Sequence, residues 1–103
     1  MKFREMSEEI TSDEILIAFL IIEPEGRLKR YERNRDYIRV FYNMPNDNNS
    51  IEHRLDLLPD DVYYIDDEKD YIETPLENGD KMFQYHQFMV AKGYSYLWKN
   101  NPY

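Results

Sequence analysis

The longest apolar stretch of the chain, residues 15–22, suits two different elements. It is continuous, rich in β-branched residues and followed by a Pro-Glu-Gly turn at 24–26, which favours a buried strand. Thr-Ser-Asp-Glu at 11–14 has the form of a capping box and instead predicts a helix that ends before the turn. The strand is the preferred interpretation, and a left-handed Gly26 would join it in a hairpin to a second strand beginning near Arg27.

Residues 36–42 alternate between the two faces of a predicted strand. The side chains expected on one face are Ile38, Val40 and Tyr42, and those on the other are Tyr37, Arg39 and Phe41. A single helix over 27–42 is the competing interpretation, because its apolar residues can also share one side of a helix.

The middle of the chain predicts a loop followed by short strands. Residues 43–50 are a loop by composition, because Asn, Asp, Pro and Ser bond to their own backbone and so compete with regular pairing. Residues 51–57 alternate as a half-buried strand that Pro59 ends. Residues 62–65 and 71–72 are short apolar islands, long enough for edge strands or for loops that aromatic side chains hold in place.

A helix is expected over residues 80–92, between an Asn-Gly pair and Gly93. Its apolar arc contains Met82, Phe83, Tyr85, His86, Met89 and Val90. After the helix, the alternating aromatic residues would either close the core or form a contact surface, and they are Tyr94, Tyr96 and Trp98.

These elements predict an α+β fold, in which a small antiparallel sheet carries a C-terminal amphipathic helix on one face. The length of 103 residues fits a single compact domain over 1–103, with a flexible tail at 100–103. An apolar share of 42% supports a folded core.

Negative charge is concentrated in residues 47–80, where twelve acidic side chains face two basic ones. Residues 27–39 are basic, with six basic and two acidic side chains. Dense carboxylates repel one another over about 8 Å in water, so they need solvent, a cation or a cationic partner. The two segments would either pair with each other as weak surface ion pairs or form separate charged faces.

The composition of the chain excludes several classes of protein. There are no cysteines, which excludes disulfide scaffolds, thiolate zinc sites and cysteine nucleophiles. The longest apolar run has eight residues, so we expect neither a membrane anchor nor a signal peptide, and we expect a cytoplasmic protein. Residues with AT-rich codons are abundant, which favours a bacterial or phage origin.

The acidic residues raise the question of metal binding, because calcium is bound by oxygen ligands such as carboxylates. Asp47 with Asn49, or Asp66 with Glu68 and Asp70, could offer them, but neither group has the EF-hand pattern. We therefore expect no metal and no cofactor.

Catalysis has little support. The chain carries two histidines, His53 and His86, and lacks a nucleophile elbow, a zinc-binding helix motif and a glycine-rich phosphate loop. Both histidines fall on predicted apolar faces, where a hydrogen-bonded core histidine is the expected role. We expect a protein that is not an enzyme.

A non-catalytic interaction protein is the preferred function, binding a basic protein partner through an exposed carboxylate-rich surface. The leading contacts are Asp60, Asp61, Asp66, Asp67, Glu68 and Asp70. One alternative is a nucleic-acid mimic that inhibits a nucleic-acid-binding enzyme. The other is direct nucleic-acid binding by the basic segment 27–39, whose aromatic residues could stack on bases, although the net charge of −8 opposes it.

Overall fold

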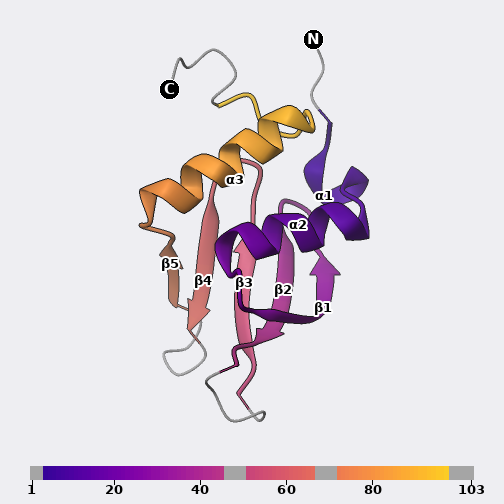
Figure 1. Cartoon of the computed structure of the whole chain (residues 1–103). Helices are drawn as coiled ribbons and strands as arrows, with labels where there is room; N and C mark the ends of the chain where they lie inside the picture. Colours follow the sequence, from indigo (N-terminus) through magenta and orange to yellow (C-terminus); the bar gives the residue numbers. More distant parts are fainter. Residues whose placement is uncertain (1–3, 46–50, 67–71, 98–103) are drawn as a thin grey trace.

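The computed structural model describes residues 4–45, 51–66 and 72–97, and Figure 1 shows a sheet with helices packed on one face. The sheet is antiparallel, and its five strands follow the chain order: β1 (Arg27–Arg33), β2 (Ile38–Asn43), β3 (His53–Leu57), β4 (Val62–Asp66) and β5 (Ile72–Pro75). The helices are α1 (Met6–Glu9), α2 (Ser12–Ile22) and α3 (Gly79–Ala91). This confirms the predicted α+β class and the C-terminal helix on one face of the sheet.

Alternation along the strands determines which side chains form the core. Val40 pairs with Leu55, and Leu55 pairs in turn with Tyr64, so these side chains lie on the same face of the sheet. Both Val40 and Leu55 are fully buried. The strands predicted over 36–42, 51–57 and 62–65 are therefore confirmed as β2, β3 and β4.

Residues 27–42 form two strands and a turn, so the alternative of one helix is wrong. In the turn, the Asn34 backbone N–H donates to the Tyr37 carbonyl across 2.9 Å. The strand expected to begin near Arg27 is β1. Apolar residues in this segment also suit a helix, but pairing with β3 buries the alternating set on β2, which a helix would not.

The preferred strand over 15–22 is wrong, because this segment lies in helix α2. The Thr11 hydroxyl accepts the Glu14 backbone N–H at 3.1 Å, and the Glu14 carboxylate accepts the Thr11 N–H at 3.0 Å. This reciprocal capping box satisfies two N–H groups that a helix start leaves without partners. The buried face of the helix carries Ile15, Ala18, Phe19 and Ile22. The capping box therefore predicted the correct element, and the β-branched composition did not.

The connection from α2 to β1 is consequently no β-hairpin, and Gly26 is not left-handed. Among the described glycines, the positive φ belongs to Gly93. Gly26 is needed for another reason, since a Cβ atom there would lie 2.5 Å from Cζ of Phe19. The absence of a side chain at Gly26 lets the chain turn under the Phe19 ring.

The helix predicted over 80–92 is α3, displaced by one residue. The Asn78 side chain accepts the Lys81 backbone N–H at 3.1 Å, and Gly93, with φ +82°, follows the helix end. After the helix, Tyr94 is buried, whereas Tyr96 is 63% exposed. Of these two aromatic residues, Tyr94 therefore packs in the core and Tyr96 does not. Trp98 and the expected tail at 100–103 lie outside the described residues.

Candidate partner-binding surfaces

Of the six acidic residues predicted as partner contacts, those that the structure describes are not gathered at one place. Asp60 and Asp61 precede β4, whereas Asp66 is its last residue. Four residue steps separate Val62 from Asp66, which is about 13 Å along a strand. The side chain of Asp66, and all of Asp67, Glu68 and Asp70, lie outside what the structure describes. Asp60 and Asp61 therefore lie at one end of β4 and Asp66 at the other.

Asp60 has an internal role. Its carboxylate accepts the hydroxyl proton of Ser95, a residue that is 1% exposed. Its backbone carbonyl accepts a hydrogen bond from Nε2 of His86 at 2.5 Å, and the nearby Leu58 carbonyl accepts one from the Tyr85 hydroxyl at 2.5 Å. Burial is the main cause that raises the pKa of Tyr85 well above 10.0, so its hydroxyl keeps the donated proton. These contacts fasten the β3–β4 loop to α3 and to the turn that follows it.

Ser95, His86 and Asp60 are the residue types of a hydrolytic triad, but their bonding differs from one. A serine hydroxyl has one proton, and Ser95 donates it to a carboxylate. In a catalytic triad that proton goes to the imidazole. His86 is 5% exposed and bonded to a backbone carbonyl, which is the core role expected for it.

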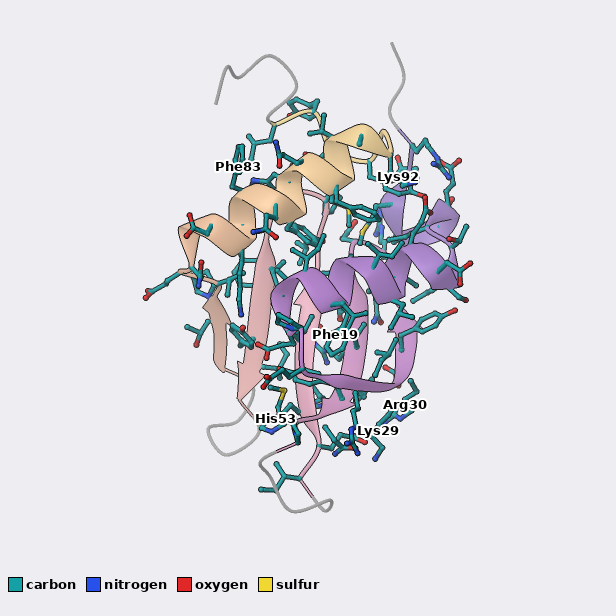
Figure 2. The ribbon with its side chains drawn as sticks, viewed as in Figure 1. Phe19, Lys29, Arg30, His53, Phe83 and Lys92 are labelled. Carbon is teal, nitrogen blue, oxygen red and sulfur yellow. The ribbon has the colours of Figure 1, made fainter. Side chains whose placement is uncertain are left out.

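Part of the acidic segment is paired with the basic segment. Asp56 is 2% exposed and accepts two hydrogen bonds from Arg39, at 2.7 and 2.9 Å. Glu52 lies 3.2 Å from the Lys29 ammonium and 3.6 Å from the Arg30 guanidinium. Figure 2 shows Lys29 and Arg30 together beside the lower end of the sheet. The expectation that the two segments face each other as ion pairs is confirmed for these residues.

Two further contacts occupy the basic segment. Arg33 donates to the carbonyls of Ser7 and Ile10, at 3.1 and 2.6 Å. The Arg30 guanidinium lies 3.6 Å from the centre of the Phe41 ring. This contact explains why Phe41, on the face of the sheet opposite the helices, is only 5% exposed. An oligonucleotide would have to compete with these internal partners.

A polar cluster lies at the C-terminal end of α2. The Tyr64 hydroxyl donates to Glu23 at 2.7 Å, and Lys81 on α3 donates to the Ile22 carbonyl at 2.7 Å. Burial, followed by the bond to Glu23, raises the pKa of Tyr64, so the hydroxyl remains a donor at neutral pH. His53 is half-buried and stacks on Tyr42 with ring centres 5.4 Å apart. The cluster joins the end of α2 to the sheet and to α3.

Sequence reasoning missed an exposed apolar face on α2. Leu16, Ile17 and Leu20 are 40%, 47% and 38% exposed, although the helix buries the opposite side completely. The interpretation as a buried strand hid this face. The capping box was the available signal, because on a helix residues 16, 17 and 20 project together, away from 15, 18, 19 and 22.

The N-terminal segment that carries this face is acidic. Residues 4–26 contain seven acidic side chains and one basic one, Arg4. The exposed acidic residues of this segment are Glu5, Glu8, Glu9, Asp13 and Glu25. We call this set the helical acidic surface. It lies on the N-terminal helices, outside the 47–80 segment singled out from the sequence.

The described residues contain no group of three or more histidine, aspartate or glutamate side chains placed to hold a metal ion. The two candidate calcium segments fall largely outside them, at 46–50 and 67–71. In the part of the chain that the structure describes, no helix has the length and apolar character to cross a membrane.

Comparison with known proteins adds no relative: no family model, no curated protein and no solved structure matches the chain.

Proposed function

We propose that this protein is a non-catalytic interaction protein that binds a basic protein partner through exposed carboxylates. The observation that supports it best is the helical acidic surface, whose five exposed carboxylates lie in a segment, residues 4–26, that has one basic side chain, Arg4. A net charge of −8 attracts cationic partners over the range of a Debye length, about 8 Å at physiological salt. Complementary charge of this kind increases association rates and selects the partner.

The acidic contacts anticipated at residues 60–70 remain part of this proposal. Within that stretch, Asp60 is bonded to Ser95, and Asp61 accepts the Val62 backbone N–H at 2.8 Å. Their carboxylates therefore already have internal hydrogen-bond partners. On the helical acidic surface Glu9 is also bonded, to the Glu5 N–H and to Arg4, whereas Glu8, Asp13 and Glu25 form no ion pair within the described residues. This favours these three carboxylates as the first point of contact.

Direct nucleic-acid binding by the basic segment has less support. The side chains of Lys29, Arg30, Arg33 and Arg39 all contact oxygens of the protein itself. A nucleic-acid mimic needs carboxylates in regular rows, whereas Asp56 is buried and Glu52 is paired with basic side chains. Neither alternative is favoured by a specific contact.

A salt-dependent pull-down from a lysate of the source organism tests the proposal. Three baits are compared with the wild type: Glu8→Gln/Asp13→Asn/Glu25→Gln on the helical acidic surface, the six-residue neutralisation at 60–70, and a control triple at exposed Glu32, Asp36 and Glu77. We expect a partner rich in Lys and Arg that is released at high salt and lost with the first bait, but retained by the control.

Binding of a fluorescent oligonucleotide to the wild type, lost with Arg30→Ala/Arg33→Ala, would replace the proposal with the nucleic-acid alternative. A captured nucleic-acid-binding enzyme that oligonucleotides displace would favour the mimic. Equal recovery of a partner by all three neutralised baits would show that carboxylates do not select it.

A further inference from the structure

Helix α2 has two apolar faces, of which one is buried in the core and the other is exposed. At about 100° per residue, Asp13, Leu16, Ile17 and Leu20 fall within an arc of about 100°. The opposite arc holds the core side chains of the helix. The exposed arc, which we call the α2 outer face, therefore has an apolar centre with an acidic residue at its N-terminal end. Figure 1 shows α2 as an outer element, in front of the sheet and beside α3.

An outward stripe of this kind is unusual for a surface helix. Surface helices place charged and polar residues opposite the core, and a helix that is apolar all round is typically covered. Single exposed apolar residues need no explanation, but a contiguous group marks an interaction site. Leu16, Ile17 and Leu20 form such a group, and each is at least 38% exposed.

The charge at both ends of the α2 outer face is negative and uncompensated. Asp13 at its beginning and Glu25 just after the helix are both exposed, and neither forms an ion pair within the described residues. Residues 12–22 contain no basic side chain. The lysines of α3 and its C-cap have other contacts: Lys81 on α3 donates to the Ile22 carbonyl, and Lys92 at the C-cap lies 4.0 Å from Glu14.

We propose that the α2 outer face docks an amphipathic helix of a basic partner, with apolar side chains at its centre and Lys or Arg at both ends. The proposal rests on the function proposed above and adds the site and the shape of the partner segment. The helical part of the separation between Asp13 and Glu25, from Asp13 to Ile22, is about 14 Å long at helical rise, and Glu25 lies three residues beyond it in the turn. A partner helix with basic residues 11 positions apart presents both on one side, about 16 Å from each other. Its apolar side chains would pack on Leu16, Ile17 and Leu20 between them.

Charge argues against a second copy of this chain as the occupant. In an antiparallel pair of α2 helices, Asp13 of one copy lies near the C-terminal end of the other, which Glu25 follows, and in a parallel pair each acidic residue lies near its own equivalent. Both arrangements place like charges at both ends of the interface, which disfavours association. Opposite charge on the partner removes this repulsion.

The probe is a synthetic peptide of about 18 residues with Leu at i, i+3, i+4 and i+7 and Lys residues 11 positions apart. Two matched peptides accompany it: one with Glu in place of Lys, and one with Ser in place of Leu. Binding to the full chain is measured by fluorescence anisotropy at low and physiological salt. We expect the Lys/Leu peptide to bind most tightly.

The key variant is Ile17→Gln/Leu20→Gln, which keeps good helix formers at exposed positions. It should weaken the Lys/Leu peptide by about tenfold or more, because the partner's apolar side chains lose their contacts. Ile51→Gln is the matched control: Ile51 is 45% exposed, close to the 47% of Ile17, but lies outside α2. It should leave binding unchanged. Circular dichroism and thermal unfolding establish that all variants fold.

The charged ends are tested separately. Asp13→Asn/Glu25→Gln should weaken the Lys/Leu peptide about threefold to tenfold and reduce its salt dependence, whereas the exposed control pair Asp36→Asn/Glu77→Gln should not.

Four results would overturn the inference. Three concern affinity: the Ile17→Gln/Leu20→Gln variant binds the Lys/Leu peptide as tightly as the wild type does, the wild type binds the Glu-ended peptide as tightly as the Lys/Leu peptide, or the charged-end pair binds as tightly as its control pair. The fourth is a wild-type dimer in analytical ultracentrifugation that these substitutions dissociate. If the Lys/Ser peptide binds as tightly as Lys/Leu, and Ile17→Gln/Leu20→Gln leaves both unchanged, a basic partner stands and the α2 docking site falls. If neither Lys peptide binds, and the pull-down also recovers no basic protein, the proposed function falls with it.

Discussion

Helices α2 and α3 lie side by side over the same sheet, yet they present opposite surfaces to solvent. Both bury one face in the shared core. The exposed stripe of α3 carries Asp80, Gln84, Gln87 and Ala91, a largely polar set, whereas that of α2 carries Leu16, Ile17 and Leu20. Packing on the sheet therefore does not require an apolar outer face, because α3 packs there without one.

The two helices show that the inner and outer faces of an amphipathic helix are determined by different requirements. Residues on the inner faces are selected by burial, and both helices meet this demand with large side chains such as Phe19 and Tyr85, each 0% exposed. Residues on the outer face of α2 contribute less to folding, so their apolar character calls for a different cause. Partner binding is the cause that we propose.

The comparison can be tested first by removing one side chain from each face of α2. Phe19→Ala should lower the free energy of unfolding by about 3 to 5 kcal/mol, because it removes a fully buried ring. Leu20→Ala, on the outer face, should cost less than about 1 kcal/mol, and Gln84→Ala on α3 should stay within about 0.5 kcal/mol. Urea unfolding followed by circular dichroism measures all three.

Equal losses for Phe19→Ala and Leu20→Ala would contradict the division between the two faces. The outer residues would then serve the core, and their exposure would need no partner. Phe19 also contacts the chain beside Gly26, so Gly26→Ala, whose Cβ would lie 2.5 Å from the ring, provides an independent check of the inner face.

The two helix starts offer a smaller contrast. Thr11 and Glu14 exchange two hydrogen bonds at the start of α2, whereas Asn78 supplies one at the start of α3. Thr11→Ala and Asn78→Ala should each lower the free energy of unfolding by about 1 kcal/mol. The Gly variants should cost only a few tenths. A loss well under that for Thr11→Ala in urea unfolding would mean that packing alone determines the start of α2.

Much of the fold follows from the sequence where one physical signal dominates. The period of two in β2 and β3 matched a half-buried strand, and α3 was bounded by Asn78 and Gly93. The prediction for residues 15–22 was wrong because hydrophobic periodicity cannot distinguish a helix from a strand when both faces of the element are apolar. Composition then favoured a strand, whereas the capping-box pattern at 11–14 indicated the helix that forms.

The surfaces were less predictable, because charge along a chain does not reveal register. Asp56 counted toward the acidic segment, but cross-strand pairing with Arg39 buries it. Asp60 is exposed and stays a predicted partner contact, and its carboxylate also accepts a hydrogen bond from Ser95, 35 positions away, which the sequence did not indicate. The α2 outer face could not be inferred while the segment was interpreted as a strand.

The smallest effect concerns the link between the two helices at Glu14. The Tyr94 hydroxyl donates to its carboxylate at 2.6 Å and is the main cause that lowers the pKa of Glu14 below 4.5, with the Thr11 N–H next. A carboxyl whose pKa falls on folding stabilises the protein above its unfolded pKa, and this contribution is lost as the pH falls through the folded pKa. Glu14→Gln preserves the capping box, so it isolates the charge. It should be less stable than the wild type at pH 7, with a gap that closes as the pH falls below about 4. Tyr94→Phe should reduce the same pH dependence. Thermal unfolding across this range measures both, and a gap of constant size would show that the charge of Glu14 does not stabilise the contact between α2 and the end of α3.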